Sequence, residues 1–311
     1  MQSPARRVPA RRVTLNAPAK LNLHLGIYTQ LDERRYHRAD SLMVALDLVD
    51  TVTVEELGAD ASGQDSVPLV TCIPPVDIPA HKNTAFRAAT ELGKRVQRKP
   101  AVRIEVVKRV PAESGMGGAS ADAAATILAL CELWDVDPAD ERVVAAARAV
   151  GADVPFFLNP VPTLLTGAGD VVEKVFPPLS KPLSVVLVRP AGPGVSTPAA
   201  YAAFDKNPLP PADPAPLCAL LEQGDPSSHE LAQLLANNLD PVACELLPAD
   251  AEVRAWLLAQ DGVLGGQVTG SGSCVFGICA CDEDAERVAR QAREIFGAWA
   301  KSAHIAAHTD K

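Results

Sequence analysis

The sequence is poor in aromatic residues and has no long hydrophobic run. Aromatic side chains make up 4% of the 311 residues, whereas hydrophobic residues as a class make up 48%, so a mainly aliphatic core is expected. No apolar stretch approaches the roughly 20 residues that span a bilayer, which argues against a membrane protein. The chain is long enough for two modest domains or one large domain.

An excess of positive charge is also missing. The 29 Lys and Arg residues are outnumbered by 38 Asp and Glu residues, which gives a formal net charge of −9. Broad binding to nucleic acid or to a membrane surface is therefore not expected. An anionic substrate would need a local cationic pocket in a protein of this charge.

Cysteines in metal-binding pairs are absent as well. The seven cysteines are odd in number and scattered, and Cys279-Ala-Cys281 has neither zinc spacing nor a second pair, so reduced thiols in the cytoplasm are predicted. The two Arg-Arg pairs near the N-terminus are not followed by an apolar segment. Residues 1–12 are accordingly predicted to be a disordered basic tail and not an export signal.

The order of the predicted elements indicates a mixed α+β fold in two domains, 13–162 and 163–303. Hydrophobic periodicity and turn residues predict strands at 13–16, 21–27, 42–48, 51–56, 101–107, 163–166, 171–175 and 183–188, on both sides of a loop within 265–279, and at the end of the chain. Helices are predicted at 83–96, 119–133, 138–150, 197–204, 229–236, 241–247, 249–259 and 283–298, with Pro138 in the first turn of the third. Irregular loops are predicted at 58–81 and over the proline-rich 207–216.

The segment from Lys108 to Leu130 carries the strongest functional signal. An alternating strand ends before it, the chain breaks at Pro111 and passes Gly115, Gly117 and Gly118, and an alanine-rich helix follows. Glycines let the backbone approach a ligand closely, and the first amides of a helix have no internal partner and favour an anion. A phosphate group is the expected ligand, although such turns often only reverse the chain.

Two further segments hold residues suited to catalysis. Strand alternation places Lys20 and Asn22 on one face, where they could supply a cation and a hydrogen-bond donor, although one lysine on a strand is more often a solvated edge residue. Asp153 in Gly-Ala-Asp-Val-Pro-Phe-Phe could be only a helix cap. Its apolar neighbours Val154, Phe156 and Phe157 would partly desolvate the carboxylate and make it a better base.

Two short motifs complete the set. Thr269-Gly-Ser-Gly-Ser-Cys274 lies between two strand-like runs and is either a plain β-turn or a loop that covers a phosphate or substrate. Tyr36-His37 lies in a charged loop. Such a pair is more often on the surface than in a site, although both rings can stack on and hydrogen-bond a nucleobase.

The order of these motifs along the chain resembles the GHMP kinase superfamily from about Val13 to Ala300. Within it, the Pro-Ala-Lys-Leu-Asn-Leu and Gly-Ala-Asp-Val-Pro-Phe-Phe segments are most similar to those of the kinases that phosphorylate the 2-hydroxyl of 4-diphosphocytidyl-2-C-methyl-D-erythritol in non-mevalonate isoprenoid synthesis. The resemblance implies a ribosomal-S5-like N-terminal domain, a ferredoxin-like C-terminal domain, and ATP with Mg²⁺ as cofactors.

The resemblance also implies roles for individual residues. Asp153 would be the base that orients or deprotonates the substrate hydroxyl, and Lys20 would steady that carboxylate and the developing charge. The cytosine of the substrate would contact Tyr36 and His37, and Asn22 would be a further substrate contact. ATP would contact Pro111, Gly115, Met116, Gly117, Gly118, Ala119, Ser120 and Asn83. The substrate would also contact Thr269, Gly270 and Ser271 of the glycine loop near the end of the chain. Asn83 would lie beside adenine and Ser120 near the phosphates or Mg²⁺, although no side-chain metal signature is present.

Four positions that carry glycine in that family carry another residue in this sequence. Glu113 and Ser114 replace loop glycines, and Ala119 replaces another. A carboxylate at 113 would weaken ATP binding unless it points outward or pairs with Lys108 or Arg109. Arg35 replaces the glycine before Tyr36-His37, so this turn is predicted not to depend on the positive φ that glycine allows.

Three functions remain open from the sequence. The leading one is the cytidyl-substrate kinase, acting on a small molecule in the cytoplasm as a monomer or homodimer. Another small-molecule GHMP kinase, of homoserine or mevalonate type, is the second. A degraded kinase kept as a nucleotide-binding regulator is the third, favoured by Glu113 and Ser114 and opposed by the retention of Lys20 and Asp153.

Overall fold

The computed structural model describes residues 11–57 and 67–307. The predicted tail therefore lies mostly outside the described residues, although Arg11 donates from Nη1 to the carbonyl of Leu133 at 2.6 Å and Arg12 begins the first strand. The chain forms two compact units of interleaved segments. Unit 1 comprises the described residues up to Ala17 with Asp50–Lys108 and Ala119–Val154, and unit 2 comprises Pro18–Val49, Arg109–Gly118 and the described residues from Pro155. The predicted domain division after residue 162 stays a prediction.

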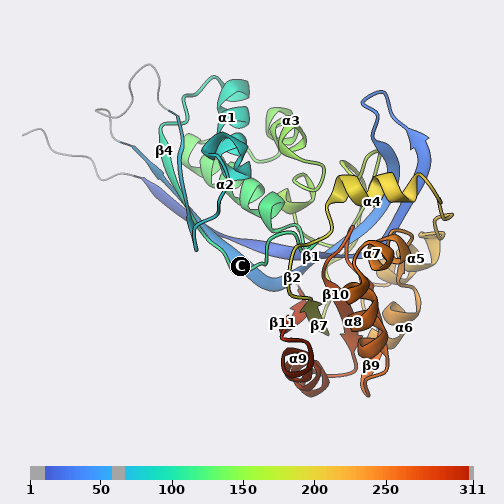
Figure 1. The fold of residues 1–311 in the computed structure, drawn as a ribbon. Helices are drawn as coiled ribbons and strands as arrows, with labels where there is room; N and C mark the ends of the chain where they lie inside the picture. Colours follow the sequence, from blue (N-terminus) through green and yellow to red (C-terminus); the bar gives the residue numbers. More distant parts are fainter. Residues whose placement is uncertain (1–10, 58–66, 308–311) are drawn as a thin grey trace, which may run out of the picture. The chain divides into compact units, whose positions relative to one another are not determined.

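Unit 1 is a small sheet with helices on one face (Figure 1). Strand β4 (Val102–Val107) pairs in parallel with β3 (Leu69–Ile73) and antiparallel with the end of β2 (His37–Glu56), from Thr51 to Glu56. The alternation predicted for β4 is confirmed, because Val102, Ile104 and Val106 are buried. The elements are β3 (Leu69–Ile73), β4 (Val102–Val107), η2 (Ala80–Lys82), α1 (Thr84–Val96), α2 (Gly118–Trp134) and α3 (Glu141–Val150).

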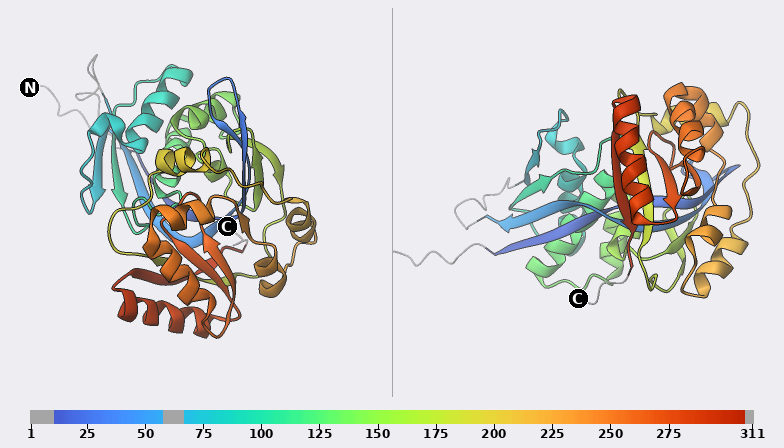
Figure 2. Two further views of the ribbon diagram at one scale, coloured as in Figure 1. Left: turned by 45° about the vertical axis from the view of Figure 1, so that its right-hand side comes forward. Right: turned by 90° about the horizontal axis from the view of Figure 1, so that it is seen from below.

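Unit 2 is built around an antiparallel sheet in the order β11 (Trp299–Ile305), β7 (Leu183–Arg189), β10 (Val275–Cys279) and β9 (Val263–Val268). Helix α9 (Asp282–Phe296) packs on β7 and β11, and α8 (Pro248–Leu258) packs on β9 and β10 (Figure 2). The two faces of this sheet carry separate cores. Val186 and Val188 pack with α8 and α9, whereas Val185 and Leu187 pack with β1 and β2. Burial on both faces explains why β7 reads as a continuous apolar run rather than an alternating one.

The remaining elements of unit 2 complete these layers. Strands β1 (Arg12–Leu31) and β2 (His37–Glu56) contribute residues to both units, β5 pairs with β2 and β6, and β8 pairs in parallel with β1. The other elements are η3 (Phe156–Leu158), β5 (Thr163–Thr166), β6 (Val171–Val175), β7 (Leu183–Arg189), α4 (Thr197–Phe204), α5 (Ala215–Glu222), α6 (Ser228–Gln233), β8 (Ala236–Asn237), α7 (Asp240–Leu246), α8 (Pro248–Leu258), β9 (Val263–Val268), β10 (Val275–Cys279), α9 (Asp282–Phe296) and β11 (Trp299–Ile305).

The mixed α+β fold is confirmed, but several local predictions are wrong. The chain runs through Pro18 as one 20-residue strand and not as two, and the strands predicted at 42–48 and 51–56 form one strand, β2. The loop predicted at 58–81 contains β3, and the proline-rich loop ends earlier than predicted because α5 starts at Ala215 with a proline in its first turn. Helix α3 starts at Glu141, after Pro138, because the side chain of Asp140 accepts from the amide of Arg142 at 2.8 Å and caps the helix.

The turn before Tyr36 corrects another prediction. Arg35 has φ +66°, so the turn requires the left-handed conformation that costs a non-glycine residue roughly 1–2 kcal/mol. We expect Arg35→Gly to raise the free energy of unfolding by about 0.5–1 kcal/mol, since glycine removes that cost but gives the unfolded chain more freedom. Denaturant unfolding measures the change. Arg35→Ala, which removes the side chain and keeps the strain, is the control, and an equal effect of both variants would contradict the backbone explanation.

The described residues also settle two compositional points. None of their helices is long and apolar enough to cross a bilayer. All seven cysteines are free thiols.

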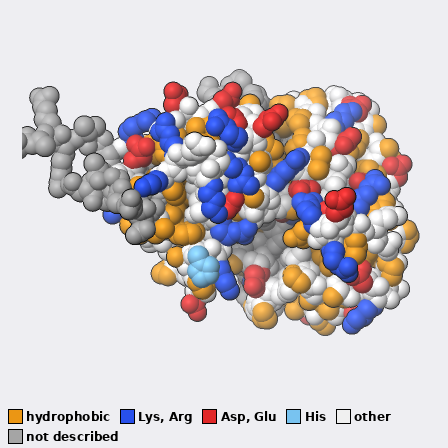
Figure 3. All heavy atoms as spheres, turned by 90° about the horizontal axis from the view of Figure 1, so that it is seen from above, with side chains coloured by type: hydrophobic (Ala, Val, Ile, Leu, Met, Phe, Trp, Pro, Cys, Tyr) orange, Lys and Arg blue, Asp and Glu red, His pale blue; other side chains and the backbone are white. Residues whose placement is uncertain are grey.

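On the face of the molecule seen in Figure 3, Lys and Arg side chains are interspersed with Asp and Glu side chains.

Candidate active site

Lys20 lies in a buried hydrogen-bond network of unit 2. Its residue is 2% exposed, its amide donates to the carbonyl of Met116 at 2.9 Å, and its Nζ donates to Oδ1 of Asn22. The hydroxyl of Thr269 lies 3.2 Å from both the amide nitrogen and Oδ1 of Asn22, so it accepts from the first and donates to the second. The predicted shared face of Lys20 and Asn22 is confirmed, and the alternative of a solvated edge lysine is wrong.

The two glycine loops of the sequence pack against each other in unit 2. The amide of Ser273 donates to the carbonyl of Glu113 at 3.4 Å, and the amide of Cys274 donates to that of Ser114 at 3.1 Å. Gly115 has φ +73°, and a Cβ there would lie 2.2 Å from the carbonyl oxygen of Thr269. Only glycine permits this approach, so the loops are held together by backbone contacts.

Gly117 and Gly270 bring both loops to the side chain of Lys20. A Cβ on Gly117 would lie 3.0 Å from Cγ of Lys20 and 2.8 Å from Cζ of Phe157, and a Cβ on Gly270 would lie 3.4 Å from the Lys20 ammonium nitrogen. Residues of three predicted motifs therefore lie near the side chain of Lys20. They are Asn22, Gly117, Thr269 and Gly270.

Residues that were not identified from the sequence form hydrogen bonds to the loop at 269–274. The side-chain amide of Asn237 donates to the carbonyls of Val268 and Gly270, at 2.9 Å each. The hydroxyls of Ser271 and Thr197 lie 3.0 Å apart. Asn237 is nine-tenths buried at the end of β8, and nothing in its local sequence distinguishes it from an ordinary turn residue.

Tyr36 and His37 differ in exposure although they are adjacent. Tyr36 is 60% exposed, with the guanidinium of Arg34 5.3 Å from its ring centroid. The His37 side chain is 9% exposed. Its Nδ1 donates to the carbonyl of Tyr28 at 2.8 Å, because a carbonyl oxygen only accepts, and its Nε2 lies 3.2 Å from a carboxylate oxygen of Asp205. The Tyr36 ring is thus on the surface, whereas the His37 ring is largely buried.

In unit 1 the starts of two helices are tied together. The hydroxyl of Thr84 in α1 donates to the carbonyl of Ala119 in α2 at 2.7 Å. A Cβ on Gly151 would lie 4.0 Å from the hydroxyl oxygen of Ser120. The predicted ATP residues Ala119 and Ser120 thus lie beside the start of α1, with the turn that holds Asp153 next to Ser120.

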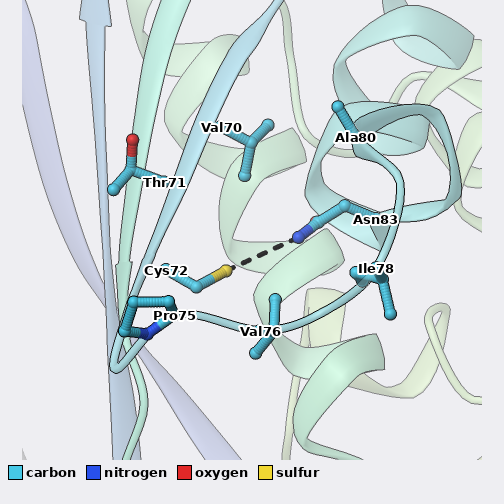
Figure 4. A pocket seen from close by; sticks show the side chains of 8 residues that line it. All are labelled: Val70, Thr71, Cys72, Pro75, Val76, Ile78, Ala80 and Asn83. Carbon is cyan, nitrogen blue, oxygen red and sulfur yellow. Dashed lines mark hydrogen bonds between the residues drawn. The ribbon is translucent and has the colours of Figure 1, made fainter.

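Asn83 caps α1 and lines a cavity of about 270 Å³ in unit 1 (Figure 4). Its Oδ1 accepts from the amide of Ala85 at 2.9 Å, so its Nδ2 points the other way and donates to the sulfur of Cys72 at 3.5 Å. The other lining side chains are largely apolar and come from β3 and the segment after it: Val70, Thr71, Pro75, Val76, Ile78 and Ala80. The cavity therefore has mostly apolar walls and one side-chain amide, that of Asn83.

A buried ion cluster supports the first turns of α2. Lys108 donates to carboxylate oxygens of Asp50 and Asp122, the latter at 2.6 Å. Burial raises the pKa of Asp122 to about 7, although Lys108 acts in the opposite direction. Lys108 is therefore engaged with these two carboxylates.

Asp153 lies in the turn after α3. It is half-buried, and its neighbours Val154, Phe156 and Phe157 are buried. Asp153 belongs to unit 1 and Lys20 to unit 2, so their pairing stays a prediction, as does the stronger basicity expected from the apolar neighbours. No group of three or more His, Cys, Asp or Glu side chains in the described parts of the chain is arranged to hold a metal ion.

Glu113 adopts φ +52°, in the left-handed region that favours glycine. Its carboxylate oxygen Oε2 accepts from the amide of Gly194 at 3.4 Å. Because the carboxylate faces Gly194, we expect Glu113→Gln to change the KM for ATP by less than about 3-fold, the effect of a weak exposed charge. Steady-state kinetics at several ATP concentrations measure it. A drop in KM of tenfold or more would mean that the carboxylate repels the phosphates.

Two family models match the chain. "GHMP kinases N terminal domain" matches residues 83–159, which hold the glycine loop and Asp153, and "GHMP kinases C terminal" matches residues 219–298, which hold the loop at 269–274. Together with the two glycine loops around Lys20, these matches define a small-molecule kinase. The chain belongs to the GHMP kinases.

Individual relatives narrow the family further. The chain is 34% identical to a 4-diphosphocytidyl-2-C-methyl-D-erythritol kinase of Pelotomaculum thermopropionicum, covering 90% of this chain and 94% of that one. It is 37% identical to the enzyme of the same name from Cereibacter sphaeroides, covering 90% and 93%. A solved structure with the equivalent name is 30% identical, with a TM-score of 0.71 over 94% of this chain. Within the GHMP kinases, the chain is a member of the 4-diphosphocytidyl-2-C-methyl-D-erythritol kinase family.

The fold alone would not distinguish this family from other GHMP kinases that act on different substrates. A homoserine kinase from Cytophaga hutchinsonii has the same TM-score of 0.71 at 18% identity. The two-domain GHMP kinase fold is thus shared across substrates, and the sequence relationship carries the distinction.

Proposed function

We propose that this protein transfers the γ-phosphoryl group of ATP to the 2-hydroxyl of 4-diphosphocytidyl-2-C-methyl-D-erythritol. The observation that carries the proposal is the buried ammonium of Lys20, held between two glycine loops in a chain whose relatives bear the name of that kinase. Phosphoryl transfer depends on positioning and charge stabilisation more than on covalent chemistry. A buried cation beside two glycine loops that are hydrogen-bonded to each other suits that requirement.

Lys20 and Asp153 are the proposed catalytic residues. Asp153 accepts the proton of the substrate hydroxyl or orients that hydroxyl, and Lys20 stabilises the negative charge that develops on the transferred group. The burial of Lys20 supports its role, because a charge acts more strongly where water is excluded.

The nucleotide is proposed to bind residues of the glycine loop and of the helix starts. The start of the 17-residue α2 offers free amides and a favourable dipole to phosphate. Gly117 leaves no room for a Cβ, so the loop backbone itself forms the cradle. The cavity at Asn83 would take the adenine ring, with the Asn83 amide as donor to a ring nitrogen.

Mg²⁺ fits this residue set as a partner of the ATP phosphates. Hard divalent cations of this kind prefer oxygen ligands and are bound through one or two protein groups plus the substrate phosphates. The hydroxyl of Ser120, in the first turn of α2, is the proposed protein ligand. When bound, the ion would neutralise charge on the phosphates, while Lys20 and the loop amides position the transferred group.

The cytidyl substrate is proposed to lie along the polar face of β1 in unit 2. Tyr36 and His37 would contact the cytosine, and the loop at Thr269, Gly270 and Ser271 would contact the methylerythritol end near Lys20. The bonds from Thr269 to Asn22 and from Asn237 to Gly270 support the second assignment, because they fix the loop beside the ammonium.

A substrate panel tests the function. The purified protein is incubated with ATP, Mg²⁺ and either 4-diphosphocytidyl-2-C-methyl-D-erythritol, homoserine or mevalonate, and ADP formation is followed. Turnover of the cytidyl substrate alone, with ³¹P NMR showing a new monoester at the 2-hydroxyl, is expected. Preference for homoserine or mevalonate would contradict the proposed substrate. Turnover of none would favour a nucleotide-binding protein without kinase activity.

A further inference from the structure

The side chain of Asp250, in the first turn of α8, is buried in unit 2 without a hydrogen-bond partner. The residue is 0% exposed, and neither of its carboxyl oxygens forms a hydrogen bond within the part of the chain that the structure describes. Its main chain is engaged, since its amide donates to the carbonyl of Leu247 at 2.8 Å. A fully buried carboxyl group is rare unless it is paired or has a specific role.

The carboxyl group of Asp250 lies against Gly272 of the loop at 269–274. A Cβ on Gly272 would lie 3.1 Å from Oδ2 of Asp250 and 3.3 Å from Cγ2 of Val195. The amide of Gly272 donates to the carbonyl of Thr269 at 3.2 Å, which closes the turn of the loop. A movement of the backbone at Gly272 is therefore passed on to Thr269, one of the proposed substrate contacts.

The charged side chains that act on Asp250 are Asp240 and Arg189, and neither is bonded to it within the described residues. The carboxylate of Asp240, in α7, pairs with Nε of Arg254 at 2.9 Å. Arg189, at the end of β7, donates from Nη1 and Nη2 to two backbone carbonyls of the segment that follows it. A negative charge on Asp250 would therefore have no bonded counter-ion in this arrangement.

The surroundings of Asp250 favour its neutral form. Burial and the negative charge of Asp240 raise the pKa of Asp250 to about 7, whereas Arg189 acts in the opposite direction. The other titratable groups that face it are the thiols of Cys274 and Cys244, and burial raises their pKa values to about 12 and about 11. Both thiols are neutral near pH 7, so neither can compensate a charge on Asp250.

We propose that Asp250 is a positioning residue that supports the loop at 269–274 in its protonated form, and that loss of its proton loosens this loop. An ionised carboxylate without a partner is strongly unfavourable in a region of low dielectric. Movement of the backbone at Gly272, which admits water to the carboxylate, relieves this cost. The loop then no longer holds its proposed substrate contacts in fixed positions. The proposal rests on the proposed function, because that function assigns this loop to the cytidyl substrate.

The pH dependence of KM tests the proposal with Asp250→Asn, which keeps the shape of the side chain and cannot ionise. At saturating ATP, the wild-type KM for the cytidyl substrate is expected to rise by up to about 10-fold between about pH 6 and about pH 8. The reason is that the protonated fraction of an acid with a pKa of about 7 falls from about 90% to about 10% over this range. The KM of Asp250→Asn is expected to change less than about 2-fold over the same range.

Asp261→Asn is the matched control, since Asp261 is an exposed aspartate of unit 2, and it should keep the wild-type pH dependence. Asp250→Leu, which fills a similar volume without a charge, replaces Asp250→Asn if the melting temperature shows that the latter fails to fold. An equal rise of KM with pH in the wild-type protein and in the Asp250 variant would overturn the proposal. So would a wild-type KM that does not change with pH.

Two readouts without substrate separate this proposal from the proposed function. In ¹³C NMR of protein labelled at the aspartate carboxyl carbons, the signal that Asp250→Asn lacks is expected to titrate near pH 7, and a midpoint below about pH 5 would overturn the proposal. Hydrogen exchange of the peptide that contains the loop at 269–274, followed by mass spectrometry, is expected to be several-fold faster in the wild-type protein than in Asp250→Asn at about pH 8 and equal at about pH 6. Equal exchange at both pH values would overturn the loosening of the loop, even if the protein phosphorylated none of the panel substrates.

Discussion

Replacing Asp153 by asparagine is expected to lower kcat by about 10²–10⁴-fold, the range for losing a positioned general base. Asparagine has nearly the same shape, so the turn after α3, in which the amide of Val154 donates to the carbonyl of Gly151 at 3.2 Å, is expected to persist. The variant removes only the ability to accept a proton. Initial rates at saturating ATP and cytidyl substrate give kcat, and the KM for ATP is expected to stay within about 3-fold of the wild-type value.

Asp135→Asn is the matched control for this substitution. Asp135 is exposed in unit 1 and has φ +56°, a conformation that asparagine adopts as readily as aspartate. The same chemical change is therefore made without strain and away from the proposed site. If Asp153→Asn and Asp135→Asn gave the same near-normal kcat, Asp153 would not be the base.

Replacing Lys20 by methionine or alanine is expected to lower kcat by about 10²–10³-fold, comparable with the loss of one preorganised donor to the transition state. Methionine fills most of the lysine volume, so it separates loss of charge from loss of packing at this residue, which is 2% exposed. The KM for either substrate should rise less than kcat falls. Full kinetic curves for ATP and for the cytidyl substrate measure the two effects.

Lys301→Met, on the exposed side of β11, controls for removal of a lysine charge in unit 2. It is expected to retain normal kinetics. A Lys20 variant in which only KM changed would assign Lys20 to substrate binding.

Much of the fold follows from local sequence. The apolar–polar alternation of β4 and the capping and apolar spacing of α1 and α9 predict these elements because their burial pattern repeats with the period of the element. Pro18 misled the prediction because a proline usually marks a break, yet β1 continues through it. The short β3 was missed because prolines lie on both sides of an apolar stretch of five residues.

The sequence predicts the parts of the candidate site that depend on local geometry, such as Lys20, but not those that depend on tertiary contacts, such as the burial of His37. Lys20 and Asn22 are two positions apart on one strand, so strand geometry alone puts them together. The enclosure of His37 depends on Tyr201, Phe204 and Asp205 of a segment far along the chain. Its burial is a tertiary property, and no local pattern encodes it.

The two glycine loops are joined through the backbones of Glu113 with Ser273 and of Ser114 with Cys274. Their sequences are therefore not separate modules. A change in either loop alters the shape that the other must match, so paired substitutions are expected to be non-additive, as for any residues in contact. In a redesign of substrate or nucleotide preference, the two loops have to be exchanged together, although about half of the chain separates them.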